Sequence, residues 1–147
     1  MKKSFNKVAK GMYWFDMGIF PGTVMFVFGF TYDETIAELK KKKADQWVLA
    51  ISEDRKLMEN SNYLAMKRCF KNTKTDSDVN FFIIKIRDQF EFNGYDYCRL
   101  AHEVLHICQY FLPDILDRGK EHEAECYLHT YLMMKCLAAL RSDKLLK

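Results

Sequence analysis

Residues 79–112 read VNFFIIKIRDQFEFNGYDYCRLAHEVLHICQYFL, and this stretch decides the fold class. Its first part, Val79–Arg87, is apolar on both faces at its middle, which predicts a strand buried inside a sheet. Asn93 can cap a helix that runs from about Tyr95 to Leu112, and Pro113 ends that helix. A buried strand followed by a long helix therefore forms the centre of the predicted structure.

The residues before this stretch carry strand signals. Met12–Ile19 and Thr23–Phe30 flank Pro21-Gly22, which is a strong turn signal, so we expect a β-hairpin. The second run, TVMFVFGF, is rich in β-branched and aromatic residues. Asp33 is a candidate cap for a short helix that follows the hairpin and ends in the lysine run Lys40–Lys43. Lysines suit the C-terminus of a helix because they complement its dipole.

The remaining segments complete the expected order of elements. Gln46–Ser52 fits strand or helix, because periodicity does not separate the two for short apolar runs. Tyr63–Phe70 is weakly strand-like, and Lys71–Asp78 is polar enough for a hairpin loop. A last helix is expected from about Lys120 to Leu140. Strands that precede a helical C-terminal half predict an α+β fold, with a small mixed or antiparallel sheet packed on C-terminal helices in one domain of residues 1–147.

Composition narrows the class of protein. The chain has 147 residues, of which 49% are apolar, so it can bury a core without disulfides. The net charge of +3 is too mild to predict binding to nucleic acid. No apolar run approaches the length of about 20 residues that spans a bilayer, so we expect a cytoplasmic protein with no membrane partner. The five cysteines form no CxxC pair, and we expect buried thiols in a reducing compartment.

Leu100–Gln109, which reads LAHEVLHICQ, carries the candidate chemistry. His102, Glu103 and His106 match the pattern H-E-x-x-H. Residues four apart project from one face of a helix, so the two imidazoles can bind one zinc ion. Glu103 lies about 100° around the helix from His102, where its carboxylate can take a proton from a water on that ion. The sequence therefore predicts one Zn²⁺ per chain, with Glu103 as general base.

A third protein ligand is needed, and the last helix offers several. Gln109 and Leu112 occupy the positions that a metzincin reserves for glycine and histidine, so that class is excluded. At about 100° per residue, Glu123 falls on an arc with Tyr127, Tyr131 and other apolar residues. We expect this arc to face the core, which makes Glu123 the third ligand. The alternatives face the other way or are histidines: Glu121, Glu125, His122 and His129.

On these residues the chain resembles metallopeptidases of the gluzincin kind, and in particular small single-domain proteins encoded by bacteriophages and mobile elements. In that group a strand precedes a helix bearing A-H-E-x-x-H, and the next helix bears E-x-x-A-Y. Here the pieces are Val79–Arg87, Ala101–His106 and Glu123–Tyr127, with Cys126 in place of the usual alanine. The resemblance covers roughly the last 70 residues. It implies zinc held by His102, His106 and Glu123, and a location in the host cytoplasm or with the virion.

Two functions compete at this stage. The first is a zinc-dependent metallopeptidase that hydrolyses a bond in a peptide or protein substrate, which could lie along a sheet edge as an added strand. The second is a zinc-stabilised structural or interaction protein without turnover, such as a component of a phage particle. Glu103 favours the hydrolase, because a purely structural zinc site needs no base and usually has four protein ligands. Tyr127 is a candidate for stabilising an oxyanion and is also a natural core aromatic residue.

Overall fold

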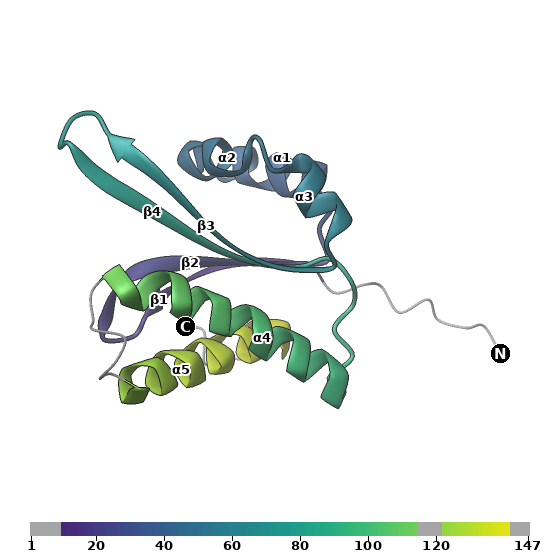
Figure 1. Cartoon of the computed structure of the whole chain (residues 1–147). Coiled ribbons are helices and arrows are strands. Elements are labelled where there is room, and N and C mark those ends of the chain that lie inside the picture. Colours follow the sequence, from purple (N-terminus) through teal and green to yellow (C-terminus); the bar gives the residue numbers. More distant parts are fainter. Residues whose placement is uncertain (1–9, 115–121, 142–147) are drawn as a thin grey trace.

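The computed structural model describes residues 10–114 and 122–141 of the chain. A four-stranded sheet lies between two helical layers, with α1, α2 and α3 on one face and α4 and α5 on the other (Figure 1). The strands are β1 Gly11–Met17, β2 Phe20–Phe28, β3 Tyr63–Asn72 and β4 Ser77–Ile86. The helices are α1 Tyr32–Lys41, α2 Asp45–Ile51, α3 Arg55–Asn60, α4 Gly94–Phe111, a short 3₁₀ turn Leu112–Asp114, and α5 His122–Arg141.

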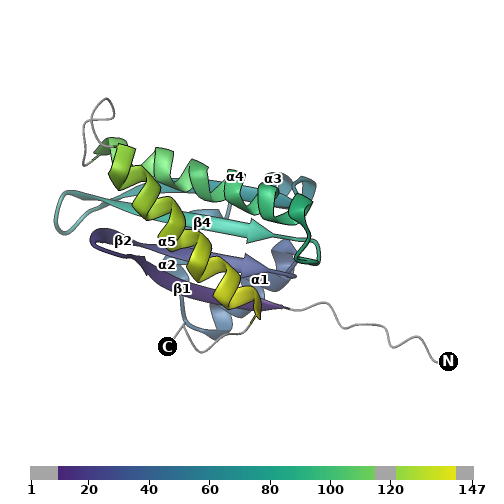
Figure 2. The same ribbon diagram turned by 90° about the horizontal axis from the view of Figure 1, so that it is seen from below.

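The strand order is β1-β2-β4-β3, which places β1 and β3 at the edges. β1 and β2 pair antiparallel, as do β3 and β4, while β2 and β4 pair parallel in the centre. The sheet is therefore mixed, and the predicted α+β class is confirmed. α4 packs chiefly on β3 and α5 on β1, so the two C-terminal helices lie side by side across the sheet (Figure 2).

The first hairpin forms as predicted, but its turn lies elsewhere. Met17 pairs with Phe20, so the chain reverses at Gly18, while Pro21 and Gly22 belong to the start of β2. Gly18 has a φ of 71°, a left-handed conformation that glycine adopts at little cost. The Pro-Gly pair predicted a hairpin in this part of the chain. The turn itself forms at Gly18, which can adopt a positive φ.

The short helices differ from expectation in detail. Thr31, and not Asp33, caps α1, because the Thr31 side chain accepts a hydrogen bond from the backbone N–H of Glu34. Gln46–Ser52, left open between strand and helix, forms most of α2. α3 was not predicted from the sequence. All three helices cover one face of the sheet.

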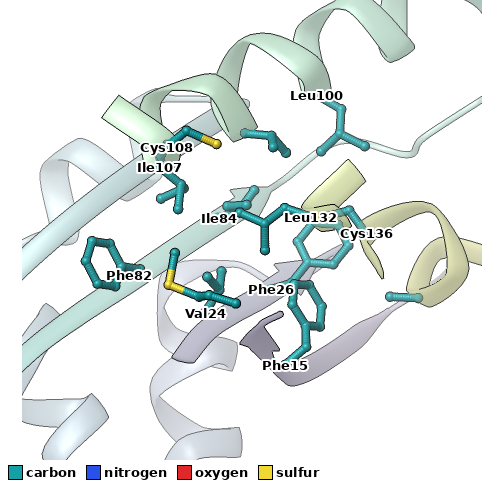
Figure 3. Packing of buried hydrophobic residues seen from close by; sticks show 14 of the residues in the cluster. Phe15, Val24, Phe26, Phe82, Ile84, Leu100, Ile107, Cys108, Leu132 and Cys136 are labelled. Atoms are coloured by element: carbon teal, nitrogen blue, oxygen red, sulfur yellow. The ribbon is translucent and has the colours of Figure 1, made fainter. Parts of the chain in front are cut away.

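The two faces of the central strand bury different cores. On one face, Phe82 and Ile84 pack with Phe26 of β2, Leu100 of α4 and Leu132 of α5 (Figure 3). The alternate residues of β4, beginning with Phe81 and Ile83, face the core beneath α1–α3. Lys85 also points to that second face, where it is 1% exposed and donates a 2.7 Å hydrogen bond from Nζ to the carbonyl of Phe30. This alternation confirms Val79–Arg87 as a strand buried on both faces.

The thiols are only partly as predicted. Cys108 and Cys136 are buried and free, and burial raises the pKa of the Cys108 thiol to about 12. Cys69, Cys98 and Cys126 are exposed, so the expectation that the cysteines are generally buried was wrong for these three. Within the part of the chain that the structure describes, no helix is long and apolar enough to cross a membrane.

Candidate metal site

The predicted metal-binding helix forms as α4, and its first turn is built as expected. The Asn93 side chain accepts a hydrogen bond of 2.8 Å from the backbone N–H of Asp96, which caps the helix. Leu100, Val104 and Ile107 are fully buried against the sheet. The residues between them are therefore turned towards the sides and the surface of the helix.

The two histidines of the motif lie together on that outer surface. Nε2 of His102 and Nε2 of His106 are 3.0 Å apart, with the rings perpendicular to each other. The His106 ring stacks on Tyr110, one turn further along α4, with the ring planes 13° apart. The pair is accessible, since His102 is exposed and His106 is half-buried.

The spacing of the two nitrogens fits a shared zinc ion. Two imidazoles bound tetrahedrally at 2.0–2.1 Å would have their nitrogens about 3.3 Å apart. The distance between the Nε2 atoms of His102 and His106 is 3.0 Å, so a few tenths of an ångström of side-chain adjustment suffices. The same distance is that of a hydrogen bond between the two rings, in which one Nε2–H donates to the other Nε2, so both nitrogens would have to turn towards a common point to bind one ion.

Glu103 and His102 line a hollow of about 480 Å³ beside the pair. The hollow lies between α4 and the start of β3, and its wall includes Tyr63, Tyr95 and Arg99. Sequence reasoning missed these three residues. Arg99 is three residues before His102 and four before Glu103, which is the spacing that puts helical residues on one face, so the pattern could have identified it.

The last helix, α5, contacts α4 on a different side from the one that carries His102, Glu103 and His106. His129 of α5 has Nε2 3.0 Å from the carbonyl oxygen of Ala101. Measured around α4 at about 100° per residue, His102 lies about 100°, His106 about 140° and Glu103 about 160° from Ala101. The motif side chains are thus turned well away from the side where α5 contacts α4.

The expectation that Glu123 faces the core was wrong. Glu123 is exposed, and the buried residues of α5 are Leu128, Leu132, Cys136, Ala138 and Ala139. Most of this buried stripe lies on the opposite side of the helix from Glu123. The arc with Tyr127 and Met134 is instead largely at the surface, since these side chains are 41% and 47% exposed.

The structure accordingly brings together two of the three predicted ligands. Among residues 10–114 and 122–141, no group of three or more His, Cys, Asp or Glu could hold a metal ion. Glu125 is half-buried, and its charge helps to raise the pKa of the Cys108 thiol after the larger effect of burial. Glu121 lies outside the described residues. The ligand role of Glu123 stays a prediction. The reason given for it, that Glu123 faces the core, was wrong.

Tyr127 does not belong to the hollow. Its ring makes an edge contact with Phe20 and stacks with Tyr131, both on the side of the molecule where α5 packs on β1. This arrangement favours a packing role for Tyr127 over the alternative role of stabilising an oxyanion.

A buried carboxylate fixes the wall of the hollow to the sheet. Asp96 is 7% exposed and accepts hydrogen bonds from the Glu91 backbone N–H at 2.7 Å and the Tyr63 hydroxyl at 3.3 Å. Burial raises the pKa of the Tyr63 hydroxyl, and the nearby charge of Asp96 raises it further. Tyr63 therefore remains a neutral donor that ties the first residue of β3 to the first turn of α4.

Comparisons of the chain with protein families, with curated proteins and with solved structures give no match.

Proposed function

We propose that the chain is a zinc-dependent hydrolase of the metallopeptidase kind, in which His102 and His106 hold the metal and Glu103 is the general base. The observation that carries this proposal is the 3.0 Å separation of the two Nε2 atoms on an accessible helix face. Glu103 lies in the same hollow as His102. A glutamate beside a histidine pair is the combination with which zinc metallopeptidases hydrolyse an amide.

The residues divide the chemistry between them. Bound zinc lowers the pKa of a coordinated water to about 7. The Glu103 carboxylate accepts a proton from the nucleophilic water and then donates it to the nitrogen of the leaving amine, so the base is regenerated. The His106 ring is held by stacking on Tyr110, which limits its rotation. Leu100, Val104 and Ile107 anchor the helix, so both imidazoles start from a rigid backbone.

The sheet edge offers a place for an extended peptide. β3 is an edge strand, and α4 packs on it. Peptides commonly bind to such edges as an added strand, because the unpaired backbone groups supply hydrogen bonds without regard to sequence. The hollow lies between the start of β3 and α4, so a chain that follows this edge would pass Glu103 and His102.

The number of grouped ligands does not favour the competing function, which is a zinc-stabilised structural or interaction protein without turnover. A catalytic zinc site usually has three protein ligands and a structural one four, and the described residues group only two. Glu103 is half-buried in the hollow and not sequestered in the core, which favours the hydrolase.

Zinc titration and peptide hydrolysis test the proposal together. Wild-type protein should bind one zinc per chain by elemental analysis, and His102→Ala and His106→Ala should each lose it. Glu103→Gln should keep zinc and lose hydrolysis of a fluorogenic peptide library, because this side chain acts on the proton and not on the metal. His122→Ala is the matched control, since His122 is an exposed histidine of α5.

The results separate the alternatives. Zinc binding without hydrolysis of any peptide would support the structural protein. Retention of zinc by both His102→Ala and His106→Ala would overturn the site itself. Loss of zinc in Glu103→Gln would make Glu103 a ligand and remove the base from the mechanism.

A further inference from the structure

The wall of the hollow contains a cation with an unusual environment. The guanidinium of Arg99 lies 4.0 Å from the centre of the Tyr63 ring and 5.2 Å from the centre of the Tyr95 ring. Both tyrosines line the same hollow as His102 and Glu103. Contacts with aromatic faces hold a guanidinium in place while they leave the N–H groups at its edge able to donate.

Arg99 is not neutralised by the acids nearest to it along α4. Asp96, three residues earlier, accepts its hydrogen bonds from Glu91 and Tyr63. Glu103, four residues later, is not within ion-pair distance of Arg99. Throughout the described part of the chain, no hydrogen bond or ion pair involves the Arg99 guanidinium. The N–H groups of the half-buried Arg99 guanidinium, next to the candidate site, are therefore available to an anion.

We propose that Arg99 is a specificity-determining residue that binds a carboxylate of the peptide substrate in the hollow beside His102 and Glu103. The planar guanidinium matches a carboxylate through two parallel hydrogen bonds, which is the strongest form of such recognition. The carboxylate comes from the C-terminus of the peptide or from an acidic side chain. This inference rests on the proposed function for its substrate class, but binding of the carboxylate does not require zinc.

The geometry of α4 sets the distance between a carboxylate bound to Arg99 and the peptide bond to be cleaved. The midpoint of His102 and His106 lies five residues beyond Arg99, a rise of about 7.5 Å along α4. An extended peptide covers about 3.3–3.6 Å per residue. A carboxylate on Arg99 therefore places the peptide bond about two residues away at the histidine pair. The expected activity is removal of short C-terminal fragments or cleavage close to an acidic residue.

Binding of three short peptides tests the inference without turnover. The probes are acetylated tetraalanine with a free C-terminus, the same peptide as its C-terminal amide, and that amide with glutamate at its third position. Each is titrated into zinc-loaded Glu103→Gln protein and into metal-free wild type by NMR. The free acid should bind about tenfold or more tightly than the amide in both, which is the effect of one charge-assisted hydrogen-bonded pair. The glutamate peptide shows whether a side-chain carboxylate substitutes.

Variants assign the effect to the residue. Arg99→Gln should abolish the preference for the free acid. Arg99→Lys should retain part of it, because lysine keeps the positive charge but lacks the paired N–H donors of a guanidinium. Arg141→Gln, which changes an exposed arginine of α5, should leave the preference intact. Equal binding of acid and amide by the wild-type protein, or no binding of either at millimolar concentration, overturns the inference without any variant.

Activity separates this inference from the proposed function. If the preference for the acid is present and depends on Arg99 but no peptide is cleaved, the carboxylate site stands and the hydrolase proposal fails. If peptides are cleaved at equal rates as acid and amide, and Arg99→Gln cleaves like the wild type, the hydrolase stands and the role of Arg99 is overturned. The expected result is a higher KM for the amide and for Arg99→Gln with the free acid, with a smaller change in kcat.

Discussion

The buried carboxylate of Asp96 should be a large local contributor to stability. Asp96→Ala removes the acceptor for the Glu91 backbone N–H, at 2.7 Å, and for the Tyr63 hydroxyl, at 3.3 Å. A donor left without a partner costs about 1–3 kcal/mol when it is buried, and the Glu91 N–H is part-buried, which places its cost towards the lower end of that range. The Tyr63 hydroxyl borders the hollow, where water can replace part of its bond. Loss of a negative charge in the first turn of α4 adds about 0.3–1 kcal/mol.

The free energy of unfolding should therefore fall by about 1–3 kcal/mol in Asp96→Ala, measured by urea denaturation followed by circular dichroism. Asp96→Asn keeps one acceptor oxygen and should lose about half as much. Tyr63→Phe tests the coupling directly: the double variant should lose less than the sum of the single losses, because both changes remove one shared bond. A loss below about 0.5 kcal/mol in Asp96→Ala would refute the assignment of this carboxylate as a satisfied buried acceptor.

Four further predictions concern other parts of the molecule. Leu132→Ala, at a site that is 0% exposed, should lower the free energy of unfolding by about 2–5 kcal/mol in urea, whereas a loss under about 1 kcal/mol would contradict the packing of α5. Gly18→Ala should lower the melting temperature, because the residue has a φ of 71° and its Cβ would lie 2.7 Å from the Tyr127 hydroxyl; an unchanged melting temperature would argue against this turn. Burial lowers the pKa of Lys85 from 10.5 to about 8, so at this residue the unfolded chain binds more protons in between; from pH 7 to above pH 10 the free energy of unfolding of the wild type should rise by about 3 kcal/mol relative to that of Lys85→Met in urea, and a difference that does not change with pH would contradict the burial of this ammonium. Glu123→Ala should leave zinc affinity unchanged in a competition titration, since this residue is exposed and points away from the buried stripe of α5; a loss of zinc would restore it as the third ligand.

Much of the fold could be predicted from local signals. The cap at Asn93 and the apolar period of α4 predict that helix from its own residues, and the apolar middle of Val79–Arg87 predicts an internal strand. The adjacency of His102 and His106 follows from the same local geometry, because residues four apart on a helix are neighbours. These features depend on spacing along one element, and the sequence contains that spacing.

The turn of the first hairpin and the capping residue of α1 were less well determined. Each depends on a single backbone conformation or a single hydrogen bond, and a competing residue stands two or three positions away: Pro21 for Gly18, and Asp33 for Thr31. The helical state of Gln46–Ser52 depends on its location over the sheet face of α1–α3, where it buries Ala50 and Ile51.

Residue patterns along the chain were sufficient to predict the α+β class, the adjacent histidines and the glutamate between them. Which side of α5 is buried depends on contacts between elements that are distant in the sequence. That helix carries apolar residues on both arcs, Tyr127 and Met134 on one and Leu128 and Leu132 on the other, so its sequence does not select a face. In the folded chain the arc with Leu128 and Leu132 is buried, and Glu123 lies at the surface. The grouping of Arg99 with Tyr63 likewise needed the contact between α4 and the edge strand, which joins residues far apart in the chain.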